Sequence, residues 1–197
     1  MSTTVTPEGT AAEMDTNIDI QNSPGSASSA VAADGSRSGT LGTVVIRVTL
    51  GVTTFFTWLG NVRDDFYSAE GLRGYFDWAF LPAEDGGNGS TLFFVRDILD
   101  ATILQAPGAF GAVQTVVELA IAIGLIFGIF TRAAALGAIG FFFSLFLVQF
   151  GGEEWIWTYV LLVASAVAVF LNWGGRTLGV DQLIAKARGE SPGGLIW

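Results

Sequence analysis

Residues 116–150, VVELAIAIGLIFGIFTRAAALGAIGFFFSLFLVQF, form the stretch that decides the fold class of this chain. Their only charged side chains are Glu118 and Arg132, and Thr131 with Arg132 divides the stretch into two apolar halves. A helix needs roughly 20 apolar residues to cross a hydrocarbon core of about 30 Å. Each half approaches this length once the apolar residues before Val116 are added to the first. We therefore predict two antiparallel membrane-spanning helices, joined by a tight turn at which Thr131 caps the second helix.

Two more apolar stretches of similar length flank this pair, which brings the number of predicted spans to four. The spans are residues 41–60, 109–130, 132–150 and 155–173. All five prolines fall outside them, as uninterrupted helices in lipid require. Tryptophans lie near the ends of the first and fourth spans, and such amphipathic rings favour the membrane–water interface. The sequence therefore predicts an all-α fold, a four-transmembrane-helix bundle over residues 41–175.

The segments outside the spans differ from them in composition. Residues 1–40 are rich in Ser, Thr, Ala, Gly and acidic side chains without an apolar period, so we expect a disordered acidic tail. The long external loop, residues 61–107, contains two amphipathic runs at 69–80 and 91–104. We expect short helices there, on the outer interface or capping the bundle, with a partly disordered connector as the alternative. Residues 176–197 are predicted to be a cytoplasmic tail with one short amphipathic helix.

Positive charges are distributed unequally between the two ends of the predicted bundle. An even number of spans places both termini on one side, together with the turn between the second and third spans. That side carries Arg37, Arg132, Arg176, Lys186 and Arg188, whereas the other side carries Arg63, Arg73 and Arg96. Because Lys and Arg are enriched in cytoplasmic loops, we expect a multi-pass protein of the cell membrane with cytoplasmic termini.

The composition argues against several classes of function. The 197 residues include no Cys and no His, and both methionines lie in the N-terminal tail. The chain therefore lacks the usual ligands of a haem, an iron–sulfur cluster or a soft metal, and we expect none of these cofactors. The sole lysine, Lys186, lies outside the spans, which leaves no residue for a retinal Schiff base. The net charge of −9 argues against a nucleic-acid partner. It indicates either acidic tails and loops that are exposed to water or adaptation to a halophilic, high-salt setting.

Two ionisable residues, Arg47 and Glu118, lie inside predicted spans. A charge at the centre of a spanning helix costs roughly 2.5–3.5 kcal/mol on insertion scales, so each side chain should face the bundle interior and find a partner. Because neighbouring helices run antiparallel, the two residues are candidates to pair with each other. Such a pair is a candidate proton or quinone site. The alternatives are a structural ion pair that fixes helix register, or an Arg47 side chain that reaches to the near interface.

Small and polar residues recur at helical spacing on the predicted spans. Trp58 and Thr54 lie on the first span with Arg47, Gln114 precedes Glu118 by one turn, and Ser144 lies on the third span. We take Trp58, Thr54, Gln114 and Ser144 as candidates to bind a cofactor in a cavity between helices. Ordinary packing is the alternative, because small residues let helices approach closely in lipid and polar residues hydrogen-bond across them.

Three stretches resemble the DoxX/DoxD-like family of small membrane proteins. They are RVTLGVTTFFTWLG at 47–60, VVELAIAIGLIFGIFTRAAALGA at 116–138 and NWGGRTLGVDQLI at 172–184. The most specific features are Arg47 near the start of the first helix, Glu118 in the second and the Thr131–Arg132 turn. The resemblance covers roughly residues 41–184, and it implies the same four-helix fold.

The long external loop makes the chain most similar to DoxD, the small subunit of a thiosulfate:quinone oxidoreductase. The resemblance implies a membrane subunit of a quinone-linked oxidoreductase with quinone as cofactor, and thiosulfate is the reductant it suggests. In that function Glu118 would supply protons, Arg47 would polarise a carbonyl oxygen, and a partner subunit or the external loop would present the reductant. The alternative is a non-catalytic membrane scaffold or assembly partner of another complex.

Overall fold

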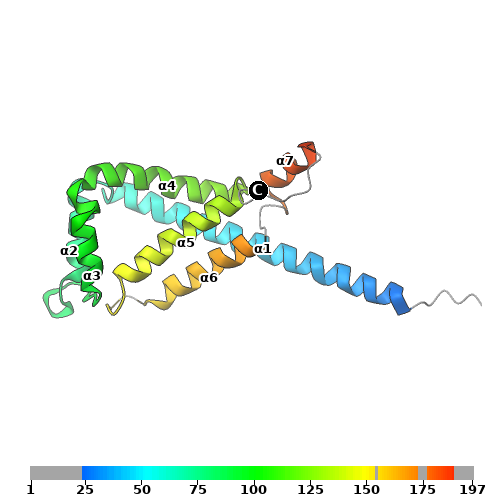
Figure 1. Cartoon of the computed structure of the whole chain (residues 1–197), viewed down its shortest axis with the longest axis horizontal. Coiled ribbons are helices and arrows are strands. Elements are labelled where there is room, and N and C mark those ends of the chain that lie inside the picture. The colour runs from blue at the N-terminus through cyan, green and yellow to red at the C-terminus, as the bar shows by residue number, and fades with distance from the viewer. Residues whose placement is uncertain (1–23, 154, 173–176, 189–197) are drawn as a thin grey trace, which may run out of the picture. The chain divides into compact units, whose positions relative to one another are not determined.

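A computed structural model of the chain describes residues 24–153, 155–172 and 177–188, and every element in these ranges is a helix (Figure 1). The α-helices are α1 (Pro24–Arg63), α2 (Ala69–Phe80), α3 (Phe93–Ala101), α4 (Pro107–Phe127), α5 (Thr131–Val148), α6 (Trp157–Leu171) and α7 (Val180–Arg188). Two 3₁₀ turns, η1 (Ala83–Asp85) and η2 (Ile103–Gln105), lie between α2 and α4. The predicted all-α class is confirmed for the described residues.

Within the described residues, three helices are long and apolar enough to cross a membrane: Leu41–Arg63 within α1, Pro107–Phe127 and Thr131–Val148. They coincide with the first three predicted spans. The fourth predicted span, 155–173, contains α6, an apolar helix of 15 residues. At 1.5 Å per residue α6 is about 22 Å long, which is shorter than the hydrocarbon core.

Helix α1 begins at Pro24, so the structure has a helix where the sequence predicts the last part of a disordered tail. The segment before Leu41 contains several alanines, and a helix that already exists extends over such residues with little further cost. Residues 1–23 of the predicted tail lie outside the described residues. Arg37–Trp197 forms one compact unit, which contains the three candidate spans.

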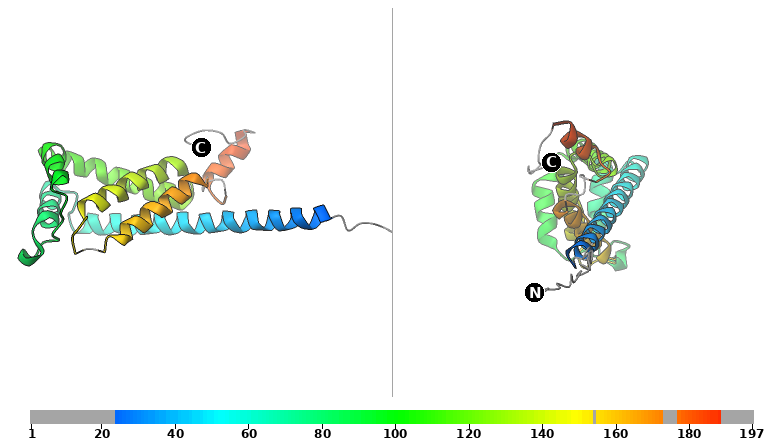
Figure 2. Two further views of the ribbon diagram at one scale, coloured as in Figure 1. Left: turned by 60° about the horizontal axis from the view of Figure 1, so that its bottom comes forward. Right: turned by 90° about the vertical axis from the view of Figure 1, so that its right-hand side faces the viewer.

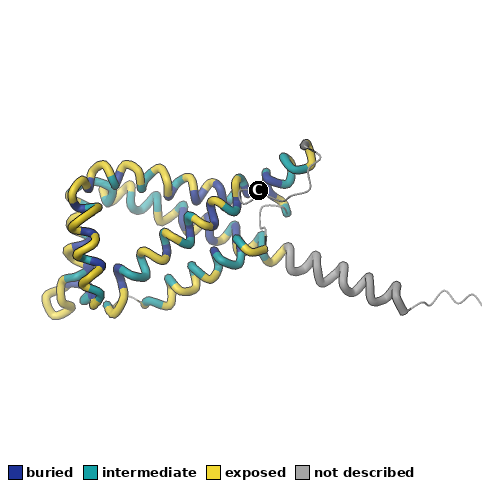
Figure 3. The backbone as a smooth tube through the Cα atoms, in the orientation of Figure 1, coloured by how far each residue is buried: buried dark blue, intermediate teal, exposed yellow. Residues whose placement is uncertain are grey.

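Within this unit α1, α4, α5 and α6 pack around a common apolar core. Its buried residues are Leu50, Ile121, Leu125, Ala134, Ala135, Ala138, Phe142, Ala166 and Val169. Alanines at the α5–α6 contact permit the close approach that van der Waals packing in lipid needs. Gly51 has the same effect between α1 and α4, because a Cβ there would lie 2.8 Å from the backbone nitrogen of Ile126. In Figure 3 buried and exposed stretches alternate along these helices, as expected when one face of each is turned inward.

The turn between α4 and α5 is closed by a residue from the far end of the chain. Gly128 ends α4 in the left-handed region, with φ of 67°. The carboxylate of Asp181 in α7 then accepts hydrogen bonds from the backbone nitrogens of Phe130, at 2.8 Å, and Thr131, at 2.9 Å. The prediction that Thr131 caps α5 is therefore wrong: Thr131 is the first residue of the helix, and Asp181 supplies the negative charge that a helix N-terminus favours.

The segment between α1 and α4 folds into helices that form a second apolar core at the other end of α5 (Figure 2). Helix α2 matches the first amphipathic run residue for residue, and α3 with η2 occupies most of the second. Leu72, Phe76 and Leu99 are buried there against Val148 at the end of α5. Arg96 of α3 joins the two short helices through an ion pair with Asp77 of α2 at 2.9 Å, and it also pairs with Asp100 of its own helix at 3.0 Å.

Candidate functional site

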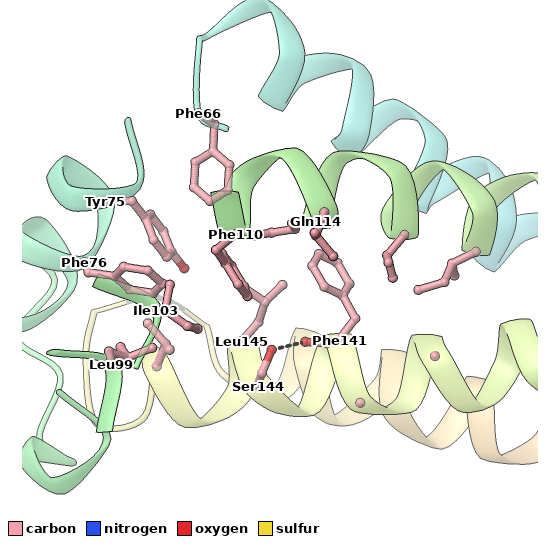
Figure 4. A pocket seen from close by; sticks show the side chains of 16 residues that line it. Phe66, Tyr75, Phe76, Leu99, Ile103, Phe110, Gln114, Phe141, Ser144 and Leu145 are labelled. Carbon is pink, nitrogen blue, oxygen red and sulfur yellow. Dashed lines mark hydrogen bonds between the residues drawn. The ribbon is translucent and has the colours of Figure 1, made fainter. Parts of the chain in front are cut away.

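A pocket of about 450 Å³ lies where α2, α3 and η2 meet α4 and α5 (Figure 4). Its walls are mainly apolar and include the rings of Phe66, Phe76, Phe110 and Phe141. Small-molecule sites commonly occupy about 300–1,000 Å³ and combine apolar walls with a few polar groups. The size and lining of this pocket fit that description.

Two of the four predicted cofactor-binding residues line the pocket, Gln114 on α4 and Ser144 on α5. The Ser144 hydroxyl donates a 2.7 Å hydrogen bond to the carbonyl oxygen of Phe141 in its own helix. Gln114 is half-buried, and it precedes Glu118 by one turn on α4. The pocket wall therefore includes a polar side chain that neighbours a buried carboxyl group.

The other two candidates, Thr54 and Trp58, lie on α1 and are not part of the pocket lining. Thr54 is fully buried, and its hydroxyl donates to the carbonyl oxygen of Leu50 at 2.8 Å. The indole nitrogen of Trp58 donates to the carbonyl oxygen of Thr115 at 3.1 Å. Thr54 therefore bonds within α1, whereas Trp58 bonds α1 to α4.

Glu118 is 1% exposed and has partners from the end of α1 and the turn that follows it. The Tyr67 hydroxyl donates to Oε2 of Glu118 at 2.7 Å, and Nδ2 of Asn61 lies 3.5 Å from Oε1. Nδ2 of Asn61 also donates to the Tyr67 oxygen at 3.3 Å. Because Tyr67 follows α1 by only a few residues, the turn after α1 brings its hydroxyl to the carboxyl group on α4.

Burial and the hydrogen bond to Glu118 both raise the pKa of Tyr67 well above its usual range. The phenol therefore remains protonated at every physiological pH. Its proton is directed at Glu118, which makes Tyr67 a permanent donor to the carboxyl group. We refer to Asn61, Tyr67, Gln114 and Glu118 as the Glu118 network.

Arg47 is also 1% exposed, but it lies in the interior of α1, several turns before Asn61, and has different partners. Nη2 of Arg47 donates to the carbonyl oxygen of Leu178 at 3.0 Å, and Nη1 lies 3.4 Å from the carbonyl oxygen of Thr177. The negative charge of Asp181 attracts the guanidinium. Gly128 leaves room for this guanidinium, because a Cβ there would come within 2.6 Å of Nη1.

The predicted pairing of Arg47 with Glu118 is therefore wrong. The Arg47 guanidinium lies beside Gly128 at the end of α4. Gly128 lies on the order of 15 Å beyond Glu118 along the helix axis, at 1.5 Å per residue, so the two charged groups are too far apart to pair. Each group is buried, as the cost of a lone charge in lipid requires, and each has its own set of partners. Arg47 binds the segment that precedes α7, whereas Glu118 lies beside the pocket.

Sequence reasoning missed a buried amide network beneath the turn-rich loop after α2. Asn88, Ser90 and Gln149 are all nearly inaccessible. Nδ2 of Asn88 donates to Oε1 of Gln149 and to Oγ of Ser90, and Nε2 of Gln149 donates to the Tyr75 oxygen at 2.9 Å. The network holds Tyr75, which lines the pocket, through a polar chain that begins in the loop.

One signal for this network was present in the sequence. Gln149 follows directly on the apolar run of α5, where an amide requires a partner, and the loop supplies Asn88 and Ser90. Gly152 leaves room for the Asn88 side chain in this network, because a Cβ at position 152 would lie 2.1 Å from Nδ2 of Asn88.

Among the described residues no group of three or more Asp, Glu, His or Cys side chains is arranged to hold a metal ion. In comparisons with models of protein families, with curated proteins and with solved structures, the chain matches none. The pocket and the Glu118 network are therefore interpreted from their own chemistry.

Proposed function

We propose that this chain is a DoxX/DoxD-like membrane subunit of a quinone-linked oxidoreductase, and that the pocket beside Gln114 binds the quinone. The observation that carries the proposal is the position of Gln114, which lines a mainly apolar pocket and lies one helical turn from the buried Glu118. Thiosulfate is the reductant that the sequence resemblance suggests, and a partner subunit would present it.

The residues of the pocket suit the chemical demands of a quinone. A quinone ring is flat and apolar, with two carbonyl oxygens that accept hydrogen bonds, so it needs an apolar slot and a donor at its edge. Phe110 and Phe141 supply apolar walls, and the amide of Gln114 supplies a donor. When bound, a quinone accepts two electrons and two protons.

Within this proposal the Glu118 network holds and moves a proton. The Gln114 amide donates to the carbonyl oxygen and fixes the ring, while Glu118 is the titratable group one helical turn away. Tyr67 and Asn61 hold the Glu118 carboxyl group in place. Arg47 has no part in the reaction: it is too far from the pocket to polarise a carbonyl oxygen there, and we assign it to the anchoring of the C-terminal segment.

We further propose four membrane crossings with both termini in the cytoplasm. Helix α6 has 15 residues, and the flanking residues Trp155, Ile156 and Asn172 would extend it to about 27 Å if they became helical in the bilayer, which suffices for the fourth crossing with modest thinning of the bilayer. Arg132 and Lys186 would then lie on the cytoplasmic side and Arg73 and Arg96 on the other, as the distribution of positive charge favours.

The experiment that tests the quinone site is a measurement of retained quinone. The full chain is purified in a mild detergent, and the lipid extract is analysed by mass spectrometry. We expect quinone at close to one molecule per chain, and a large loss in Gln114→Leu. Thr115→Val is the matched control, because the Thr115 hydroxyl bonds only to Gly111 within its own helix and should leave quinone retention unchanged. Purified, folded protein without quinone would overturn the proposal.

A non-catalytic scaffold is the second candidate, and the environment of Arg47 favours it. That guanidinium, one of the two buried charges predicted as catalytic, is satisfied by backbone carbonyl oxygens and Asp181. Its role is thus structural, and a scaffold would require the same of Glu118. A scaffold would copurify with a larger enzyme and contain no quinone, which separates it from the first proposal.

A further inference from the structure

The pocket lining includes exposed residues of both α4 and α5. These residues include Val113, which is 62% exposed, and Val117, which is 48% exposed, on α4, and Gly140 and Ser144 on α5. Both helices are among the three that are apolar enough to span a membrane. In the bilayer these exposed residues would face hydrocarbon and not water.

The end of the pocket nearest α2 and α3 is covered. Phe76 and Leu99 are buried there in the second apolar core, and Phe66 and Tyr75 pack edge to face with ring centroids 5.2 Å apart (Figure 4). A ligand that entered at this end would have to separate these rings from the core. The side between α4 and α5 is the route that requires no such separation.

Gly140 of α5 keeps the groove between α4 and α5 clear. A Cβ at Gly140 would meet no atom within 4 Å, so a side chain there would project into unfilled space. Gly137 differs, because a Cβ there would lie 3.0 Å from a side-chain carbon of Ile121, so this glycine permits close packing of α5 on α4. Glycine at position 140 costs helix propensity in water, and here it leaves space that a ligand can fill.

We propose, resting on the quinone function proposed above, that the ligand is a long-chain isoprenoid quinone that enters sideways from the bilayer. The ring lies beside Gln114, and the chain leaves between α4 and α5 past Gly140 into the surrounding lipid. A pocket of about 450 Å³ accommodates a ring and the first part of a chain. The remainder of the chain stays in hydrocarbon, where it loses no hydrophobic free energy.

Photo-crosslinking tests the path of the chain. The full-length protein in lipid nanodiscs is incubated with a ubiquinone analogue that carries a diazirine midway along its isoprenoid chain, then irradiated and digested. We expect adducts on the peptides that contain Val113, Val117 and residues 140–144. Adducts confined to α2, α3 or α1 would overturn the lateral route.

A paired substitution tests the groove itself. Gly140→Leu places an apolar side chain in the open groove without a backbone clash, whereas Gly60→Leu does the same at a position on α1 that also has no atom within 4 Å and lies outside the pocket. We expect Gly140→Leu to weaken binding of the long-chain quinone by about tenfold or more and Gly60→Leu to leave it unchanged. Equal affinity in wild type and Gly140→Leu would contradict the proposal.

A quinone without a chain, 2,3-dimethoxy-5-methylbenzoquinone, distinguishes a failure of the proposed quinone site from a failure of the proposed chain path. Should this ring compound and the long-chain form both fail to bind the wild type, the proposed function itself is wrong. Should the ring compound bind as tightly as the long-chain form, with both dependent on Gln114, the quinone site stands and the lateral chain path is wrong. We expect the long-chain form to bind at least about tenfold more tightly.

Discussion

The hydroxyl of Tyr67 lies 2.7 Å from Oε2 of Glu118, although the two residues are 51 positions apart in the chain. This hydrogen bond joins the turn after α1 to the middle of α4, and it determines which side of α4 the carboxyl group faces. Gln114 occupies the same side one turn earlier and lines the pocket. The bond is thus the structural link between the packing of the helices and the candidate site.

Tyr67→Phe should destabilise the protein by about 1–3 kcal/mol, because it leaves the buried Glu118 carboxyl group without its shortest hydrogen bond. Denaturation followed by tryptophan fluorescence in a fixed detergent measures the change. The matched comparison is the same substitution in a Glu118→Gln background, where the loss should be smaller because a neutral amide accepts a weaker hydrogen bond from Tyr67 than a carboxylate does. Equal losses in the two backgrounds would show that the phenol and the carboxyl group do not interact.

Alkaline pH should reduce stability through Tyr67. The pKa of this phenol is raised in the folded state by burial and by its bond to Glu118, so the folded protein keeps a proton that the unfolded chain releases. Its contribution is complete below the unfolded pKa, about 10, and is lost as the pH rises above that value. Unfolding measured from pH 8 to pH 11 should show a downward slope that Tyr67→Phe reduces. An unchanged slope in the variant would assign the effect to another group.

The spanning helices and the burial of the two charged residues could be predicted from the sequence, but the partners of those residues could not. Uninterrupted apolar stretches predict α1, α4 and α5, and the cost of a charge in lipid predicts that Arg47 and Glu118 are buried. Neither rule identifies the partner. Arg47 binds backbone carbonyl oxygens that carry no sequence signal, and Glu118 binds a phenol from a turn.

The loop after α2 illustrates the same limit. Asn88 and Ser90 lie in a run of turn residues that is typical of a solvated connector, yet both are buried. Their burial depends on Gln149, which lies 61 positions from Asn88 and becomes a neighbour only when α5 packs against the loop. Likewise Gln114 and Ser144 were candidates from helical spacing, but the pocket that selects them over Thr54 and Trp58 is formed by α2 and α3.

Glu118→Gln should preserve the fold and the bound quinone while it lowers quinone-linked turnover by about 10²–10⁴-fold, the range in which positioned acid–base groups contribute. Gln has the same shape and keeps a hydrogen bond to Tyr67, but it does not exchange a proton. Turnover is measured with the protein in its native membrane complex, with quinone content determined on the same sample. Full turnover with an unchanged quinone content would remove Glu118 from the reaction.

Asp181→Ala should release the C-terminal segment. The substitution removes the acceptor for the backbone nitrogens of Phe130 and Thr131 and the carboxylate near Arg47, which together stabilise the contact by about 1–2 kcal/mol. Hydrogen exchange at residues 177–188 should become faster, whereas quinone binding stays intact because the pocket is at the other end of α4. Asp97→Ala, at an exposed position of α3, is the control. Unchanged exchange would mean that Asp181 does not anchor α7.

The central claim is that a quinone lies in the pocket with one carbonyl oxygen on Gln114. An experimental structure of the full chain in nanodiscs, prepared with excess ubiquinone, measures this directly. We predict ring density between Phe110 and Phe141, with a carbonyl oxygen within about 2.7–3.2 Å of Nε2 of Gln114. A pocket filled by protein side chains, or quinone density at a different surface of the bundle, would contradict the claim.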